Sequence, residues 1–281
     1  MTSNRPDEEN AAIRSAVSPK LALSQSEIAA RTDAYFNRTQ AIVSHFGECE
    51  VTYALFIRRP VIAAHGLMIE WLRNVAREQG FSVAIEIMTP EGSWVGAGEP
   101  LVYLTGPFTR MAPLETLLLQ KLGSACVAAH NAYQMALALP DAAFMAMEAR
   151  HCAGFEMQEI MGYAASVGSR AARREGARGF VGCANDVTAG FFGAERGLGT
   201  MPHALIGYAG STCVPLKCIT RSIRTIRWWC WSITSVRRSP MRWPSAVASP
   251  SWQLRGASVC VWIPMAGASS KGSIRNLPMA C

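Results

Sequence analysis

The feature that most constrains the fold of this chain is a change in composition after Thr212. Residues 213–281 contain ten Lys and Arg and no Asp or Glu, although the whole chain has 27 basic and 20 acidic side chains. The first 212 residues therefore hold 17 basic and all 20 acidic side chains, a net charge of −3. Six of the eight tryptophans also follow Thr212. The formal charge of +7 thus belongs to the C-terminal segment, and each part has to be interpreted on its own.

The segment 213–281 has two interpretations. Its stretch "RTIRWWCWSITSVRRSP" (224–240) mixes arginines with tryptophans, a composition typical of arms that bind nucleic acid or an acidic membrane surface. The alternative is translation in the wrong reading frame. The sequence itself can test this alternative, because Trp and Met each have a single codon.

The fixed codons favour the wrong reading frame. Read one base earlier, Trp228 followed by Trp229 encodes valine, and Trp262 followed by Ile263 encodes aspartate. With permitted third bases, 227–275 can encode an aliphatic run ending in aspartate, a helix-like segment and a second strand ending in aspartate, an alternation that the written segment lacks. We therefore predict that 213–281 is an out-of-frame, non-native tail, with neither nucleic acid nor a membrane as its partner. The nucleotides around codons 211–213 would show the shift.

The first 212 residues have the composition of a globular α/β protein. Half of the chain is hydrophobic, and it has no run of 18 apolar residues that would predict a membrane span. The N-terminus, "MTSNRPDEENAAIRS", lacks the apolar core of a secretion signal, so we expect a cytoplasmic location. The scattered cysteines have no CxxC spacing and predict buried free thiols, with no metal site: Cys49, Cys126, Cys152 and Cys183.

Residues 1–20 are predicted to be disordered, and 21–140 to form an N-terminal α/β module with a connecting helix. Ser24 or Ser26 is placed to cap a helix that continues to about His45. The stretch 89–107, "TPEGSWVGAGEPLVYLTGP", has the Pro and Gly punctuation of a hairpin or small barrel edge. The remaining patterns predict strands at 50–57 and 81–88, a helix that starts near Gly66 and is stopped by Gly80, and a long helix within 113–139.

From 141 to 212 the pattern changes to short strand, polar residues and helix, as in a partial α/β barrel. "AFMAM" precedes Glu148 and a predicted helix near 155–174, "GFVG" precedes "CAND", and a third short segment ends in "LGTMPH". Side chains at the carboxyl ends of parallel strands gather at one mouth. We therefore expect six side chains to converge: Arg150, His151, Asn185, Asp186, Thr200 and His203.

Several of these stretches resemble nicotinate phosphoribosyltransferase, most closely its archaeal-like branch. They are "TDAYF", "EGSWVGAGEPLVYLTGP", "LETLLLQKL", "EARH", "GFVGCANDVTAG" and, most specific, "GTMPHALI". The resemblance covers 31–212 and resumes only in the shifted frame. It implies an N-terminal α/β module packed on a type II phosphoribosyltransferase α/β barrel, which is incomplete here.

The resemblance also implies a reaction. Nicotinate attacks the anomeric carbon of phosphoribosyl pyrophosphate, and nicotinate mononucleotide and pyrophosphate are formed in NAD salvage. ATP with Mg²⁺ is implied as a co-substrate, without a tightly bound cofactor, and the intact protein would be a homodimer. Quinolinate phosphoribosyltransferase has similar stretches at 91–107 and 114–120, and it remains an alternative.

Three candidate roles concern carboxylate and phosphate groups. Arg150 at a strand tip can hold the nicotinate carboxylate by paired, charge-assisted hydrogen bonds; its alternative is a surface ion pair with Glu148 or Glu156. His203 matches the family histidine that accepts a phosphoryl group from ATP, and an imidazole is a suitable nucleophile near neutral pH. Gly199 and Thr200 would let the backbone approach the phosphate.

The remaining candidates concern the ring and the ribose. Asn185 and Asp186 could position either of them, but "CANDVTAG" fits a helix cap equally well. Tyr35 matches a family tyrosine that stacks on nicotinate from the neighbouring subunit. The family often has Arg where this chain has His151, so no role is assigned to it.

Three further histidines, His45, His65 and His130, are expected to be structural. The acidic residues that grip the ribose hydroxyls in the family, and its later phosphate loops, are absent from the written frame. We therefore expect the written chain to fold poorly and to lack turnover.

Overall fold

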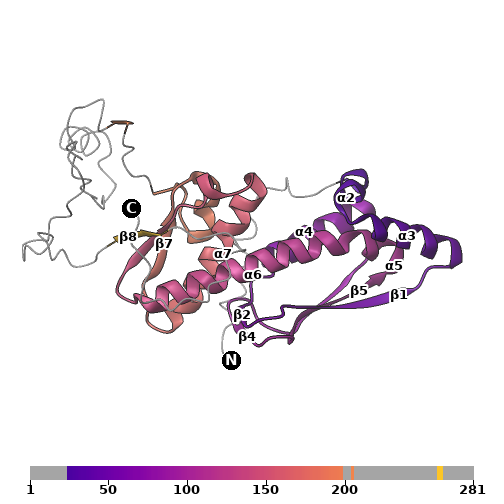
Figure 1. Cartoon of the computed structure of the whole chain (residues 1–281), viewed down its shortest axis with the longest axis horizontal. Helices are drawn as coiled ribbons and strands as arrows, with labels where there is room; N and C mark the ends of the chain where they lie inside the picture. Colours follow the sequence, from indigo (N-terminus) through magenta and orange to yellow (C-terminus); the bar gives the residue numbers. More distant parts are fainter. Residues whose placement is uncertain (1–23, 199–203, 206–257, 262–281) are drawn as a thin grey trace, which may run out of the picture.

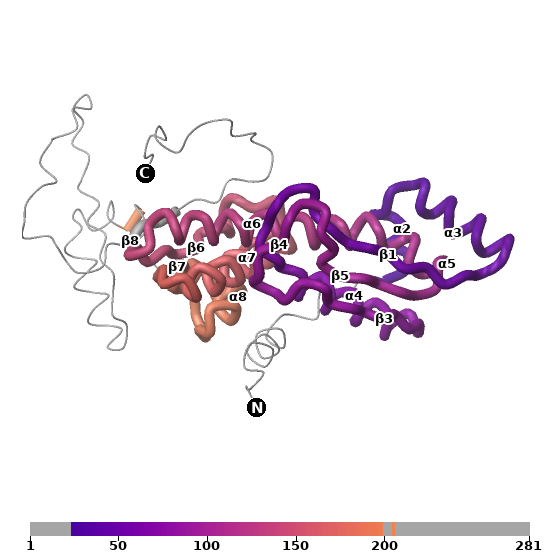
Figure 2. The backbone as a smooth tube through the Cα atoms, turned by 90° about the horizontal axis from the view of Figure 1, so that it is seen from below, coloured from indigo at the N-terminus to yellow at the C-terminus, as the bar shows by residue number. Residues whose placement is uncertain are grey.

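The computed structural model describes residues 24–198, 204–205 and 258–261. Figures 1 and 2 show an N-terminal module at one end of the molecule and a parallel sheet at the other. The long helix α6 (Glu115–Ala138) runs from the module to that sheet and packs on both. Within the part of the chain that the structure describes, no helix is long and apolar enough to cross a membrane.

The module begins with two helices, α2 (Gln25–Arg31) and α3 (Ala34–Phe46). Ser24 caps α2 in a capping box with Glu27, as one of the two predicted caps. The prediction of one helix to His45 is wrong at Thr32, whose extended backbone (ψ 155°) interrupts it. The Thr32 hydroxyl donates to Thr116 of α6 at 3.2 Å, so a tertiary contact holds the break.

A three-stranded antiparallel sheet in the order β1-β5-β3 forms the module's main layer. Its strands are β1 (Glu50–Phe56), β3 (Ala84–Ile87) and the central β5 (Pro100–Pro107). The expected hairpin within 89–107 is not formed, because β4 (Trp94–Val95) pairs with β2 (Val61–Ile62) and β5 pairs with β1 and β3. Buried side chains of β5 place it in the interior: Leu101, Val102 and Leu104.

The helices of the module follow the predicted patterns. Helix α4 (Gly66–Gln79) ends at Gly80, whose left-handed backbone (φ 68°) suits a residue without a Cβ. A short helix, α5 (Phe108–Met111), and the 3₁₀ turn η2 (Ala112–Leu114) lead into α6. Trp71 of α4 is 1% exposed and belongs to a core that also includes side chains of β5, α6 and α7.

The second region contains a parallel sheet in the order β7-β6-β8. The predicted strands are confirmed as β6 (Ala143–Ala146) and β7 (Gly179–Cys183), and the predicted helix as α7 (Phe155–Arg174). Three short pieces follow the strand ends or α8: η3 (Ala149–His151), α8 (Asp186–Ala189) and η4 (Gly190–Phe192).

The third strand of this sheet comes from an unexpected part of the chain. The segment expected to supply it ends in "LGTMPH" (198–203), which lies outside the described residues except for Leu198. In the described structure β8 (Ser258–Val261), from the segment predicted to be out of frame, lies parallel to β6 with Ser258 opposite Ala143. Backbone pairing needs only an extended chain, so this strand leaves the reading-frame prediction open.

The two regions meet along α6 and α7. Gly168 of α7 lies so close to α6 that an added Cβ would meet the carbonyl oxygen of Ala129. Tyr163 of α7 donates to Glu91 of the module and accepts from the Gly66 backbone N–H at 2.8 Å. These contacts fix the barrel portion against the module.

The cysteines agree only in part with the prediction. Cys126 and Cys183 are buried, Cys152 is half-buried and Cys49 is exposed, and all four are free. Burial raises the pKa of Cys126 to about 12, which keeps this thiol protonated at neutral pH.

Candidate active site

The candidate site lies where β6 and β7 end. Ala146 of β6 is paired with Cys183 of β7, and the Ala184 N–H donates to the Ala146 carbonyl at 2.9 Å. The chain after β6 carries Glu148 and Arg150, and the chain after β7 carries Asn185. The predicted convergence of these two segments follows from the parallel pairing of their strands.

Glu148 connects the two strand ends. Its carboxylate oxygen Oε1 accepts from the Asn185 amide at 2.9 Å and from the Thr188 hydroxyl at 2.8 Å. The residue is only 5% exposed, and its second oxygen, Oε2, is buried without a hydrogen-bond partner among the described residues. The sequence pattern predicted Glu148 only as a possible ion-pair partner of Arg150, and the contacts that join it to the end of β7 depend on residues distant in the chain.

Asn185 forms the helix cap that the sequence left as one of two possibilities. Its Oδ1 accepts from the Thr188 N–H at 3.1 Å, at the start of α8. Asp186 accepts from the Gly197 N–H at 2.8 Å and lies 3.8 Å from the guanidinium of Arg196. Both side chains therefore shape the loop after β7, and their proposed contacts with ring or ribose stay predictions.

Arg150 is exposed in η3, beside the strand ends. The alternative for this residue was an ion pair with a neighbouring carboxylate. Glu148 instead bonds Asn185 and Thr188, and Glu156 pairs with Lys121 of α6. Within the described part of the chain, the two carboxylates considered for that ion pair thus bond other residues, and the role of Arg150 stays a prediction.

Lys121 of α6 is a second cation, but its side chain is buried and pairs with Glu156 of α7. Its side chain is 3% exposed, and its Nζ lies 5.0 Å from the centre of the Trp71 ring. Burial lowers the pKa of Lys121 to about 8, whereas the ion pair with Glu156 favours its charged form. This ion pair joins α6 to the first turn of α7, the helix that follows η3 and Arg150.

Tyr35 lies apart from the strand ends, in the first turn of α3. It is 56% exposed, and its ring contacts that of Phe36 with a centroid distance of 4.2 Å. Three other candidates, Gly199, Thr200 and His203, lie outside the described residues, so their roles stay predictions.

The histidines expected to be structural have different surroundings. His65 is buried at the start of α4, and its Nε2 lies 2.9 Å from the Thr89 carbonyl oxygen. Burial, followed by the charge of Arg59, lowers the pKa of His130. His45 is exposed beside Phe46, and His151 is exposed next to Arg150.

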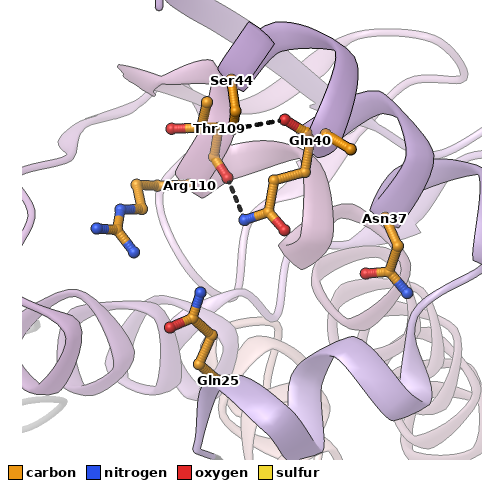
Figure 3. A pocket seen from close by; sticks show the side chains of 7 residues that line it. Gln25, Asn37, Gln40, Ser44, Thr109 and Arg110 are labelled. Carbon is orange, nitrogen blue, oxygen red and sulfur yellow. Dashed lines mark hydrogen bonds between the residues drawn. The ribbon is translucent and has the colours of Figure 1, made fainter.

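A polar pocket lies in the module, between α2, α3 and α5. Gln40 donates to the Thr109 carbonyl at 2.8 Å, and the Ser44 hydroxyl donates to the Gln40 carbonyl at 2.8 Å (Figure 3). Arg110 contributes a cation to this pocket. Among the described residues no group of three or more His, Cys, Asp or Glu is placed to hold a metal ion.

Comparison with known proteins assigns the fold. No family model and no curated protein matches the chain. A solved nicotinate-nucleotide pyrophosphorylase from Pyrococcus furiosus superposes with a TM-score of 0.55 at 24% identity, over 72% of this chain and 49% of that one. The fold is that of a type II phosphoribosyltransferase. The chain spans about half the length of that structure, in agreement with an incomplete barrel.

Two more distant structures were also found. Human nicotinic acid phosphoribosyltransferase gives a TM-score of 0.47 at 22% identity, over 63% of this chain and 40% of that one. A nicotinate-nucleotide pyrophosphorylase from Ehrlichia chaffeensis gives 0.45 at 14% identity, over 80% of this chain and 68% of that one. Both scores are below 0.5, so the fold assignment rests on the Pyrococcus structure.

Proposed function

We propose that this chain contains the pyridine-binding part of a nicotinate phosphoribosyltransferase of NAD biosynthesis. The single observation that carries the proposal is Arg150, an exposed residue after β6 whose two candidate ion-pair partners, Glu148 and Glu156, bond other residues. A guanidinium binds a carboxylate through two parallel hydrogen bonds and so fixes the plane of the attached ring. The fold of the superposed pyrophosphorylase supports the proposal, because ligands of such sheets bind at the carboxyl ends of the strands.

In this proposal the described residues bind and orient the pyridine. Arg150 holds the nicotinate carboxylate and leaves the ring nitrogen free to attack the anomeric carbon of phosphoribosyl pyrophosphate, from which pyrophosphate departs. Tyr35 of a second subunit stacks on the ring, which its exposure in the single chain permits. Asn185 and Asp186 keep the loop after β7 in place beside the ring or ribose.

The residues proposed to react with ATP lie outside the described part of the chain. His203 would accept the phosphoryl group, and Gly199 and Thr200 would let the backbone approach it. Mg²⁺ would arrive bound to the phosphates of ATP. A cytoplasmic location and a homodimer are parts of the same proposal.

We further propose that the written chain is a frameshifted form of this enzyme. The basic, acid-free composition of 213–281 supports this, as does the strand and helix order encoded one base earlier. The gene sequence around codons 211–213 provides the test. If the neighbouring frame is interrupted by stop codons, the frameshift is excluded.

The binding part of the proposal can be tested on the full 281-residue chain. Titration calorimetry with nicotinate should show that Arg150→Gln weakens binding about tenfold to a hundredfold, since a charge-assisted bidentate contact is lost. Arg196→Gln is the matched control, because Arg196 is 85% exposed and lies outside the proposed contact. Equal affinities for the Arg150→Gln variant and the unaltered chain would refute the role of Arg150.

A second pyridine substrate, quinolinate, is the alternative within the same fold. His151, next to Arg150, could bind the second carboxylate of quinolinate. The name of the Pyrococcus structure, nicotinate-nucleotide pyrophosphorylase, does not state which pyridine is the substrate. Turnover of nicotinate and quinolinate by the protein restored to one frame separates the two. Exclusive use of quinolinate would overturn the nicotinate assignment.

The basic tail offers a rival of another class, a non-catalytic nucleic-acid or membrane-binding protein. Deletion of 213–281 should leave nicotinate binding unchanged under our proposal. Loss of tight nucleic-acid or lipid-vesicle binding on this deletion, together with no binding of any pyridine carboxylate, would favour the rival.

A further inference from the structure

The polar pocket of the N-terminal module contains a cation that no described carboxylate pairs. The pocket has a volume of about 350 Å³, and its polar lining consists of Gln25, Asn37, Gln40, Ser44, Thr109 and Arg110 (Figure 3). Cavities of about 300–1,000 Å³ hold small molecules. In the described part of the chain, Arg110 is half-buried and its side chain forms no ion pair or hydrogen bond. A guanidinium in this position is suited to a carboxylate, whose two oxygens match its planar donors.

The side chain of Asn37 adds an acceptor whose orientation is fixed. Its Nδ2 donates to the Ala29 carbonyl of α2 at 2.8 Å, and because a carbonyl only accepts, the amide cannot be turned over. Its Oδ1 therefore faces away from Ala29, and this oxygen is buried without a donor among the described residues. Folded proteins rarely leave a buried amide oxygen unpaired, because its lost hydration is not recovered. The pocket thus lacks a hydrogen-bond donor next to Asn37.

Gln40 presents a second amide oxygen to the same pocket. Its Nε2 donates to the Thr109 carbonyl at 2.8 Å, which fixes Oε1 in the same way. Asn37 and Gln40 are three residues apart on α3, so their side chains lie on one face of the helix. In Figure 3 the two amide oxygens point toward each other, and Arg110 lies on the other side of Gln40. Two oriented acceptors and one guanidinium therefore line one small cavity.

This arrangement selects a ligand that carries both charges. The guanidinium needs an anionic acceptor, whereas the amide oxygens need donors, and an ammonium group has donors only. A free α-amino acid carries a carboxylate and an ammonium group on the same carbon atom. Nicotinate offers only acceptors at neutral pH, so it leaves the two amide oxygens unpaired.

We propose that this pocket is a binding site for a free α-amino acid, whose carboxylate binds Arg110 and whose ammonium group binds the amide oxygens of Asn37 and Gln40. The inference goes beyond the proposed function, because the pocket shares no residue with the ends of β6 and β7. A bound amino acid connects α3 with α5 and stabilises the folded module by mass action.

The test uses the full 281-residue chain, with each standard L-amino acid as a probe. Thermal unfolding should show a higher midpoint with at least one of them, and titration calorimetry then measures its affinity. The matched probes are the amide of that amino acid, which lacks the carboxylate charge, and the corresponding acid without the amino group. Both should bind about tenfold or more weakly, because each loses a charge-assisted contact.

Two variants test the contacts within the pocket. Arg110→Gln should weaken amino-acid binding about tenfold to a hundredfold, and Asn37→Leu, which removes the unpaired oxygen at similar volume, about tenfold. Arg38→Gln is the matched control, since Arg38 is exposed on α3 and does not line the pocket. Circular dichroism verifies the fold of each variant. Arg110→Gln removes no hydrogen bond of the described side chains, so its effect is not one of misfolding.

The outcomes separate this site from the strand ends. Unchanged amino-acid binding in Arg110→Gln overturns the proposal, and so does a chain that binds no amino acid. If amino-acid binding falls in Arg150→Gln and persists in Arg110→Gln, the ligand occupies the strand ends and the pocket is not its site. Nicotinate binding should be equal in Arg110→Gln and the unaltered chain. A chain that binds an amino acid but no nicotinate overturns the proposed function alone.

Discussion

The N-terminal module and the barrel portion differ in how completely they bury their own strands. In the module, the residues of the central strand β5 are buried or half-buried, and they share one large core with α4 and α6. In the barrel portion, β6 and β7 share a much smaller core whose largest members are Phe144 and Phe180, stacked with a centroid distance of 5.3 Å. The larger core spans both regions, because α7 of the barrel portion contributes to it, whereas the core around β6 and β7 is small.

This difference explains where the candidate site lies. The chain after β6 carries the buried Glu148, whose Oε2 has no hydrogen-bond partner among the described residues, and the exposed Arg150. In the module, Ser24 caps the start of α2, and α6 packs against α7 and β7 of the barrel portion. The larger core and the proposed pyridine contact of Arg150 therefore lie in different parts of the molecule.

The largest expected effect comes from breaking the contact between the regions. Gly168→Ala should lower the free energy of unfolding by about 3 kcal/mol, because the added methyl group meets the Ala129 carbonyl oxygen of α6. Urea unfolding followed by circular dichroism measures the change. Gly123→Ala is the matched control: it has open space in α6 and should be neutral or stabilising by up to about 1 kcal/mol. A Gly168→Ala variant as stable as the parent would show that the two regions are not tightly packed.

The second effect concerns the buried cation that joins α6 to the start of α7. Because burial lowers the pKa of Lys121 to about 8, the unfolded chain binds more protons than the folded chain between pH 8 and its ordinary pKa near 10.4. The free energy of unfolding contributed by Lys121 therefore rises with pH across this window, by on the order of 2 kcal/mol. Lys121→Met should remove this rise.

Urea unfolding at pH 7, 8, 9 and 10 measures the Lys121 effect as a difference between variants. Arg38→Met is the control, since Arg38 is exposed on α3 and an arginine keeps its charge throughout this range. Parallel pH profiles for the parent and Lys121→Met would contradict a buried, perturbed lysine.

The smallest effect is confined to the far end of the module. Ser24→Ala removes the capping box with Glu27 and should cost about 1 kcal/mol, without changing nicotinate binding. Ser26→Ala is the matched control within the same first turn and should be nearly neutral. Thermal unfolding and calorimetry check both statements. A loss of nicotinate affinity in Ser24→Ala would show that the two regions are more strongly coupled than their cores suggest.

Local sequence patterns predicted most of the elements. The apolar spacing of α4 and α7, the stop at Gly80 and the strands β1, β6 and β7 were confirmed, because each depends on neighbours within one helix or strand. The break at Thr32 and the pairing of β4 with β2 were missed. Both depend on contacts with distant segments, such as the hydrogen bond from Thr32 to Thr116.

For the candidate site, the sequence by itself determined the order of strand, polar residue and helix, and hence that Arg150 and Asn185 follow neighbouring strands. Only the tertiary structure decided which polar groups are satisfied. It joined Glu148 to Asn185 and Thr188, paired Glu156 with Lys121, and left one oxygen of Glu148 without a hydrogen-bond partner among the described residues. The physical reason is that periodicity reports which face of an element is apolar, whereas hydrogen-bond partners far apart in the chain are selected by distance in three dimensions.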